Sequence, residues 1–174
     1  MLDALEIVDV RYGRRVSSPL ILGPIRRRVR QVLEDRLIDE PVIALQGPRS
    51  VGKSTILREL AQARGADVLD LDDVAVRDAV RRDPGSFVAG DAPVFIDEYQ
   101  HVPEVLDAIK AELNRDLRPG RFVLTGSTRL DALPRAAQSL TGRQHVSSIW
   151  PLSQGEIQGV EENLVAVLLA DPTA

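Results

Sequence analysis

Four residues with a fixed spacing give the first indication of chemistry. Gly47, Gly52, Lys53 and Ser54 satisfy the pattern G-x-x-x-x-G-K-[S/T], in which a glycine-rich loop joins a buried strand to a helix. The backbone N–H groups of such a loop and the positive end of the helix dipole favour a bound phosphate. The alternative is a glycine-rich turn without a ligand, but an apolar run precedes the motif and a helical pattern follows it. The predicted phosphate-binding residues are Gly47, Pro48, Arg49, Ser50, Val51, Gly52, Lys53, Ser54 and Thr55.

Lysine at position 53 is unusual for this chain, which has twenty arginines and only two lysines. Inside a closed loop of backbone donors, a compact ammonium on a slim stem can reach between the last two phosphates of a nucleotide. The broad planar fork of arginine suits paired carboxylates and isolated phosphates better. We therefore assign Lys53 to the nucleotide phosphates, and the Ser54 hydroxyl to a magnesium ion that bridges them.

Two adjacent carboxylates, Asp97 and Glu98, follow the apolar run "PVFI". In a phosphate-loop protein, an aspartate at the end of a neighbouring strand holds magnesium through water, and a glutamate directly after it can polarise the attacking water. A helix N-cap or a solvated strand end is the alternative. We expect Asp97 near the metal and Glu98 as the base.

Small hydroxyl residues follow another aliphatic run, "FVLT", and include Thr125, Ser127 and Thr128. If this strand lies between the first and third strands, these hydroxyls face the terminal phosphate, and Ser127 is the predicted sensor. A turn built around Gly126 is the alternative.

An arginine that meets the charge developing in the transition state of phosphoryl transfer accelerates the reaction by about 10³ to 10⁵, and one of the twenty arginines is the best candidate for this role. Arg143 follows a glycine just before the last predicted strand, and Arg129 is the second candidate. A surface arginine paired with an acidic neighbour is the alternative.

The elements that must position these residues alternate along the chain between short aliphatic runs and helical patterns. This alternation is typical of strand–helix–strand units around a parallel sheet. The first, third and fourth runs are almost continuously apolar, so we expect them to be central strands. The five predicted strands are 42–45, 67–71, 93–97, 121–125 and 145–150.

Helices are predicted before, between and after these strands from apolar spacing and end signals. They span residues 24–37, 54–64 and 103–117. A fourth helix should open at a capping box, "SQGE" at 153–156, and continue through a longer apolar stripe. The members of that stripe are Val160, Leu164, Val167 and Leu168.

The series "GPRSVGKST", "VFIDEYQHVPE", "FVLTGST", "SLTGR" and "WPLSQGE" resembles the AAA-superfamily ATPase domain, family 14, of prokaryotic ATP-binding proteins, over roughly residues 24–160. The resemblance implies a three-layer α/β P-loop NTPase with a five-stranded parallel sheet in the order 5-1-4-3-2. It implies ATP/ADP and Mg²⁺ as cofactors. By the same resemblance Lys53 and Ser54 are nucleotide and magnesium residues, Asp97 and Glu98 the acidic pair, Ser127 the sensor, and Arg143 the arginine after Thr-Gly.

The predicted organisation is an N-terminal extension over 1–23, the P-loop domain over 24–160, and a C-terminal helix over 161–174. The resemblance implies that this helix leads toward a second domain. We expect its apolar stripe to pack on the core or on another copy of the chain, so a homo-oligomer is one expected partner arrangement.

Charge and composition limit the partners. The net charge of −4 argues against general nucleic-acid binding. Residues 11–30 are rich in arginine and contain no acidic residue, so this segment could contact nucleic acid or an acidic protein. A solvated helix face is favoured over such a contact, because aromatic residues do not alternate with the charges. No signal peptide or membrane span is evident in the sequence, which predicts a cytoplasmic protein without a membrane partner.

Three functions compete at this point. The leading one is magnesium-dependent hydrolysis of ATP to ADP and phosphate, driving or gating an attached or partner module. ATP is preferred to GTP because no Asn/Thr-Lys-x-Asp element is present. The second is a nucleotide-gated switch or scaffold with little turnover, and the third is a small-molecule kinase.

Overall fold

The computed structural model describes residues 6–9, 14–17, 25–127 and 140–160. Contacts divide the chain into a larger unit, Arg27–Leu152, and a smaller one made of Met1–Arg26 and Ser153–Ala174. The domain boundaries expected near residues 23 and 160 stay predictions. The C-terminal helix expected over 161–174 lies outside the described residues.

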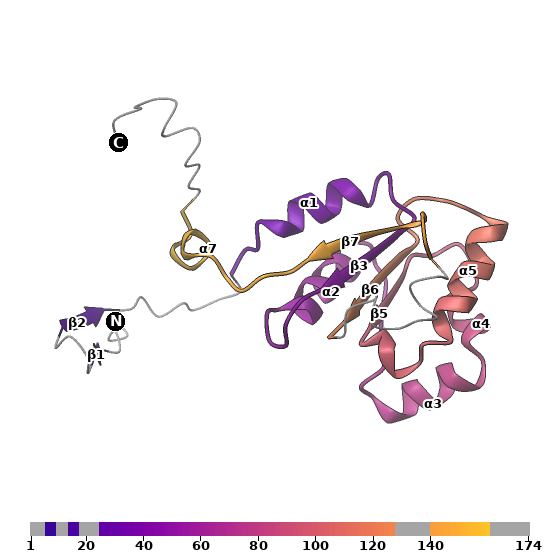
Figure 1. Cartoon of the computed structure of the whole chain (residues 1–174), viewed down its shortest axis with the longest axis horizontal. Helices are drawn as coiled ribbons and strands as arrows, with labels where there is room; N and C mark the ends of the chain where they lie inside the picture. Colours follow the sequence, from indigo (N-terminus) through magenta and orange to yellow (C-terminus); the bar gives the residue numbers. More distant parts are fainter. Residues whose placement is uncertain (1–5, 10–13, 18–24, 128–139, 161–174) are drawn as a thin grey trace. The chain divides into compact units, whose positions relative to one another are not determined.

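The larger unit is built around five parallel strands (Figure 1). Their spatial order is β4-β5-β6-β3-β7. Numbered along the chain from β3, this order is the predicted 5-1-4-3-2. The three runs expected to be central, now β3, β5 and β6, do occupy the three central positions. The strands are β3 (Val42–Gln46), β4 (Val68–Asp70), β5 (Val94–Asp97), β6 (Phe122–Gly126) and β7 (Gln144–Ser148).

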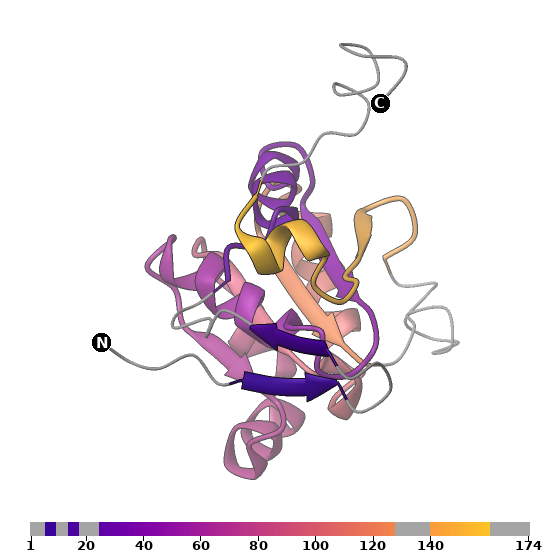
Figure 2. The same cartoon turned by 90° about the vertical axis from the view of Figure 1, so that its left-hand side faces the viewer.

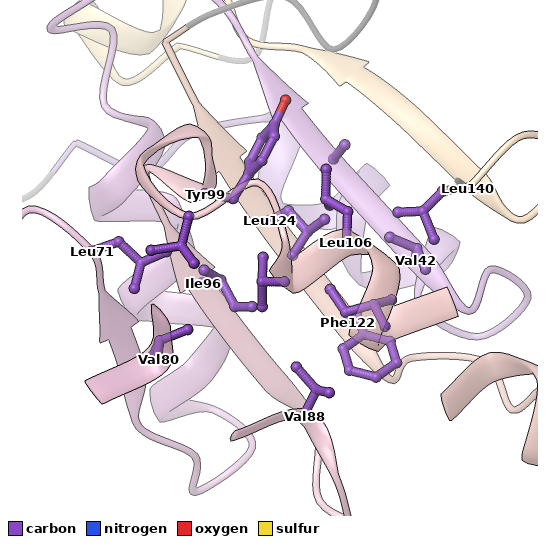
Figure 3. Close-up of a cluster of buried hydrophobic side chains, with 14 of the residues drawn as sticks. Val42, Leu71, Val80, Val88, Ile96, Tyr99, Leu106, Phe122, Leu124 and Leu140 are labelled. Carbon is purple, nitrogen blue, oxygen red and sulfur yellow. The ribbon is translucent and has the colours of Figure 1, made fainter. Parts of the chain in front are cut away.

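The central strands are apolar on both sides because each side faces its own core. In β3, Val42 and Ala44 belong to one buried cluster, while Ile43 and Leu45 belong to the other. Figure 3 shows the first cluster, which includes Val42 of β3 and both Phe122 and Leu124 of β6. Full burial of an aliphatic side chain contributes about 1.5–3 kcal/mol, so these short strands are held mainly by their two cores.

Helices cover both sides of the sheet and complete three layers (Figure 2). Side chains of α1 and α2 pack into one core, and those of α3, α4 and α5 into the other. No helix in the described part of the chain has the length and apolarity needed to cross a membrane. The helices are α1 (Val29–Arg36), α2 (Lys53–Gln62), α3 (Val74–Arg82), α4 (Pro84–Val88) and α5 (Val105–Arg115), with a 3₁₀ turn η1 (Tyr99–His101).

Two local expectations differ from the structure. Helix α1 begins at Val29 and not at Pro24, and the Arg27 carbonyl accepts from the Arg30 amide in the turn that opens it. Helices α3 and α4 had no predicted counterpart. The signal for α3 was present, because the Asp73 side chain accepts from the amides of Ala75 and Val76 as an N-cap.

The smaller unit contains an antiparallel pair, β1 (Glu6–Asp9) and β2 (Arg14–Ser17), and the short helix α7 (Gln154–Gln158). The predicted capping box between Ser153 and Glu156 is confirmed. The predicted extension of this helix through Val160 is wrong, because Gly159 adopts a left-handed conformation with φ of 66° and ends it. The other stripe residues, Leu164, Val167 and Leu168, lie outside the described residues.

Candidate functional site: a phosphate loop facing an acidic strand end

The loop between β3 and α2 has the concave backbone that its motif predicts. Gly47, Ser50 and Gly52 have positive φ angles of 152°, 62° and 91°, and they alternate with residues of ordinary φ. Such alternation turns successive N–H groups toward one side, as in anion-binding loops. Gly47 also lies against the end of β7, where a Cβ would be 2.2 Å from the Ile149 carbonyl oxygen. Position 47 therefore requires glycine for both conformation and space.

Lys53 is the first residue of α2 and is only 5% exposed. Its Nζ donates to the carbonyl oxygens of Gly47, at 3.0 Å, and Pro48, at 2.8 Å. The ammonium therefore lies across the phosphate loop. An ammonium has three donors, so it can carry its charge to a phosphate oxygen while it still contacts the loop.

The phosphate loop forms one wall of a cavity of about 450 Å³. On that side the lining comes from Arg49, Ser50 and the first turn of α2, including Lys53, Ser54 and Thr55. Three residues that are distant in sequence also line the cavity: Asp72, Glu98 and His101. The cavity thus brings a candidate carboxylate base together with the phosphate-binding loop.

A buried threonine organises the acidic pair at the end of β5. Asp97 is 3% exposed and Thr125, on the neighbouring strand β6, is fully buried. The Thr125 hydroxyl donates to Asp97 Oδ1 and accepts from the Glu98 amide at 3.3 Å. Thr125 was expected to face the terminal phosphate, but the structure engages its hydroxyl with the two acidic residues. Thr128 lies outside the described residues.

The oxygen donors around the cavity fit a hard divalent cation. Ser54 lines the cavity, and Asp97 ends the strand directly before Glu98. The described residues contain no cluster of three or more histidine, cysteine or carboxylate side chains that would form an all-protein metal site. Magnesium usually binds through one or two protein oxygens together with waters and phosphate oxygens. Ser54 and Asp97 therefore fit a nucleotide-bound magnesium better than a resident metal.

A sequence model of a family described as an AAA domain matches residues 39–158, most of the chain, including the phosphate loop, the acidic pair and β7. The chain belongs to this AAA-domain family. Together with the parallel sheet in the order found here, this membership makes it a P-loop nucleotide-binding domain.

The curated relatives of this AAA domain are longer proteins. Uncharacterized proteins of Mycobacterium bovis and Mycobacterium tuberculosis are each 32% identical to it over 131 residues. The aligned segment covers 74% of this chain but only 29% of each relative. The relatives therefore contain a domain of this kind within a larger chain, and their names assign no activity.

Solved structures with a similar chain path include AMPPCP-bound DnaA from Aquifex aeolicus, 16% identical with a TM-score of 0.48, over 86% of this chain and 57% of DnaA. The Walker-type ATPase PABY2304 of Pyrococcus abyssi is 16% identical with a TM-score of 0.41, over 86% and 65% of the two chains. Assignment to the AAA-domain family depends on the sequence match and not on these likenesses.

Arg27 is a structural residue of the loop that sequence reasoning missed. Its Nη1 donates to the Val51 carbonyl and its Nη2 to the Trp150 carbonyl, both at 2.6 Å. Its neighbour in the basic segment, Arg30, pairs with Glu34 at 3.0 Å and with Glu59 at 3.6 Å. Part of the segment considered for an acidic partner is thus engaged within the AAA domain itself.

Arg143 lies at the amino ends of the strands, whereas the phosphate loop lies at their carboxyl ends. It precedes β7, whose first residue, Gln144, is level with Val42 at the start of β3, whereas the loop follows the end of β3. The two ends of β3 are roughly 13 Å apart, at about 3.3 Å per residue. Arg143 Nη1 donates to Asn114 Oδ1 near the end of α5. A transition-state role for Arg143 stays a prediction. Arg129 lies outside the described residues.

Two more cavity residues were not predicted. His101 Nε2 is 3.0 Å from Asp72 Oδ1, and both side chains line the cavity. His101 also accepts a bond at its carbonyl from Arg81 of α3 at 3.2 Å. The polar run "EYQH" after the acidic pair was the available signal, because it showed that polar residues continue beyond Glu98.

Proposed function

We propose that this AAA domain binds ATP with magnesium and hydrolyses it to ADP and phosphate. The observation that carries the proposal is that Lys53, Ser54 and Glu98 line the same cavity. An arrangement of a cation, a hydroxyl and a carboxylate around one space suits phosphoryl transfer to water, which depends on positioning and electrostatic stabilisation.

In the proposed reaction, water attacks the terminal phosphorus while Glu98 accepts its proton. The bond between that phosphorus and the bridging oxygen breaks, and ADP leaves with the bridging oxygen. Lys53 and the N–H groups of the phosphate loop stabilise the charge on the phosphate oxygens. Magnesium, held through Ser54 and, by way of water, Asp97, would neutralise further charge on the phosphates.

Hydrolysis would drive or gate a module attached to or bound by this domain. The mycobacterial relatives support this part of the proposal, because the matched segment is less than a third of each protein. We propose that the rest of such a chain, or a separate protein, responds to the nucleotide state.

A switch with little turnover is the second candidate. It is favoured by the position of Arg143, which lies at the amino ends of the strands, away from the phosphate loop of its own chain. Without a second copy to supply that cation, hydrolysis would be slow and the ATP-bound state would persist.

Phosphate release with Mg-ATP separates these candidates. We expect the wild-type chain to release phosphate, and Glu98→Gln to lose about 10² or more in rate while it still binds ATP. Glu104→Gln is the matched control, because Glu104 is exposed at the start of α5. A negligible wild-type rate with tight ATP binding would favour the switch, and release only after an acceptor is added would indicate a kinase.

A further inference from the structure

Gln100 contacts both the proposed base and the predicted sensor. It lies in η1, two residues after Glu98, and its Nε2 donates to Glu98 Oε2 and to the Ser127 hydroxyl oxygen, at 3.2 Å from the latter. Ser127 closes the triangle, because its amide donates to the same Glu98 Oε2 at 3.3 Å. One amide group therefore joins Glu98, just after β5, to Ser127, just after β6.

Chemistry determines the orientation of this amide. If the Gln100 oxygen faced Glu98, two acceptors would meet and repel, so the nitrogen must point toward the carboxylate. The Gln100 Oε1 is then buried and finds no hydrogen-bond donor among the described residues. Gly126 leaves room for the Gln100 side chain: a Cβ at position 126 would be 2.8 Å from this oxygen and 2.7 Å from Tyr99 Cε1.

The backbone of Glu98 needs such support. Glu98 has a left-handed conformation with φ of 52° and ψ of 47°, which is uncommon for a residue with a side chain. Its amide is held by Thr125, and its Oε2 by Gln100 and Ser127. With Oε2 anchored at the end of β6, Oε1 is the oxygen available to take a proton from water.

We propose that Gln100 is a positioning residue that holds the Glu98 carboxylate in its reactive orientation and links it to Ser127. This inference rests on the proposed hydrolysis. Gln100 acts through Glu98 and does not itself contact the reacting atoms. A contact of Ser127 with the terminal phosphate would then reach the base through the Gln100 side chain and through the Ser127 amide itself.

The test compares Gln100→Met, which keeps the length of the side chain but removes its donors, with Gln31→Met. Gln31 is the matched control because its amide also donates to a carboxylate, Asp35 Oδ1, at 3.1 Å, but on the exposed face of α1. We expect kcat for Mg-ATP to fall about tenfold in Gln100→Met, because misplacement of a catalytic group is costly. We expect KM and the Kd for ATP to stay within about twofold, and Gln31→Met to match the wild type.

A second comparison excludes a merely structural effect. In the Glu98→Gln background, adding Gln100→Met should change kcat by less than about twofold, because residues that act as a unit are not additive. The same tenfold loss in both backgrounds would overturn the inference, as would an unchanged kcat in Gln100→Met alone.

Amide hydrogen exchange tests the positioning without turnover. The Ser127 amide should exchange at least about tenfold faster in Gln100→Met than in the wild type or in Gln31→Met, because the carboxylate that accepts it is released. Unchanged exchange at Ser127 would contradict the inference even in an active enzyme. A wild-type chain that releases no phosphate would contradict the proposed hydrolysis. Faster Ser127 exchange in Gln100→Met than in that inactive wild type would still support the contact between Gln100 and Glu98.

Discussion

Arg27 and Trp150, 123 positions apart in the chain, are joined by a 2.6 Å hydrogen bond from the Arg27 guanidinium to the Trp150 carbonyl. The other end of the same guanidinium donates to Val51 within the phosphate loop. The planar fork places a different nitrogen on each of these two carbonyls. The loop that contains Lys53 is therefore fastened to the end of β7 by a residue outside the motif.

Substitution of Arg27 should destabilise the domain and loosen the loop. We expect Arg27→Lys to lower the free energy of unfolding by about 2 kcal/mol, because two different nitrogens of the fork bind the Val51 and Trp150 carbonyls and lysine has a single nitrogen, so one carbonyl loses its donor. Arg26→Lys, at an exposed neighbouring position, should have little effect. Denaturant unfolding and ATP titration measure both effects, and wild-type values for Arg27→Lys would contradict the role of the fork.

Gly47→Ala should weaken ATP binding at least about tenfold. The new methyl group would collide with the Ile149 carbonyl, 2.2 Å away, and the φ of 152° is unfavourable for alanine. Gly65→Ala is the control, because Gly65 also has a positive φ, of 63°, but no atom lies within 4 Å of a Cβ there. The control should lose about 1 kcal/mol of stability and keep its affinity. Equal ATP affinities for the two variants, measured by calorimetry, would show that contact with β7 does not shape the loop.

Thr125→Val should reduce both stability and turnover, whereas Thr125→Ser should largely preserve them. Valine has nearly the same shape but no hydroxyl, so Asp97 Oδ1 loses its donor and the Glu98 amide its acceptor. The expected cost is about 1–3 kcal/mol, the usual penalty of leaving a buried polar group unpaired. Thermal unfolding and phosphate release are the measurements. If the valine and serine variants behaved alike, the hydroxyl would have no role at the acidic pair.

Arg143→Ala should leave the activity of a single chain within about twofold of the wild type, because its side chain contacts Asn114 at the amino ends of the strands, away from the phosphate loop. A loss of activity that grows with protein concentration would instead indicate that Arg143 serves another copy of the chain. Phosphate release should be measured over a dilution series, with the molecular mass determined at each concentration. A large loss in solutions that contain only monomer would contradict the placement of Arg143.

Much of the fold was predictable because its signals are local and periodic. Continuous apolar runs identified β3, β5 and β6 as central strands, since both sides of each are buried. The spacing of Gly47, Gly52, Lys53 and Ser54 identified the loop, because its chemistry depends on consecutive backbone groups. The strand order was expected from the resemblance to a family and is confirmed. Helices α3 and α4 were not predicted, although Asp73 was available as an N-cap signal for α3.

Contacts between side chains distant in sequence could not be predicted in this way. Arg27 appeared as one of three consecutive arginines, and no sequence period indicates that it binds Val51 and Trp150. The parallel register placed Arg143 before the start of β7 and Glu98 after the end of β5, at opposite ends of the parallel strands.

The sequence by itself determined that this chain has a phosphate loop, a carboxylate pair and a two-sided sheet, because spacing and apolar runs are properties of neighbouring residues. Only the tertiary structure decided which polar groups meet: Thr125 with Asp97, and Gln100 with Glu98 and Ser127. A hydrogen bond depends on distance and direction in space, and these follow from how the strands lie beside one another.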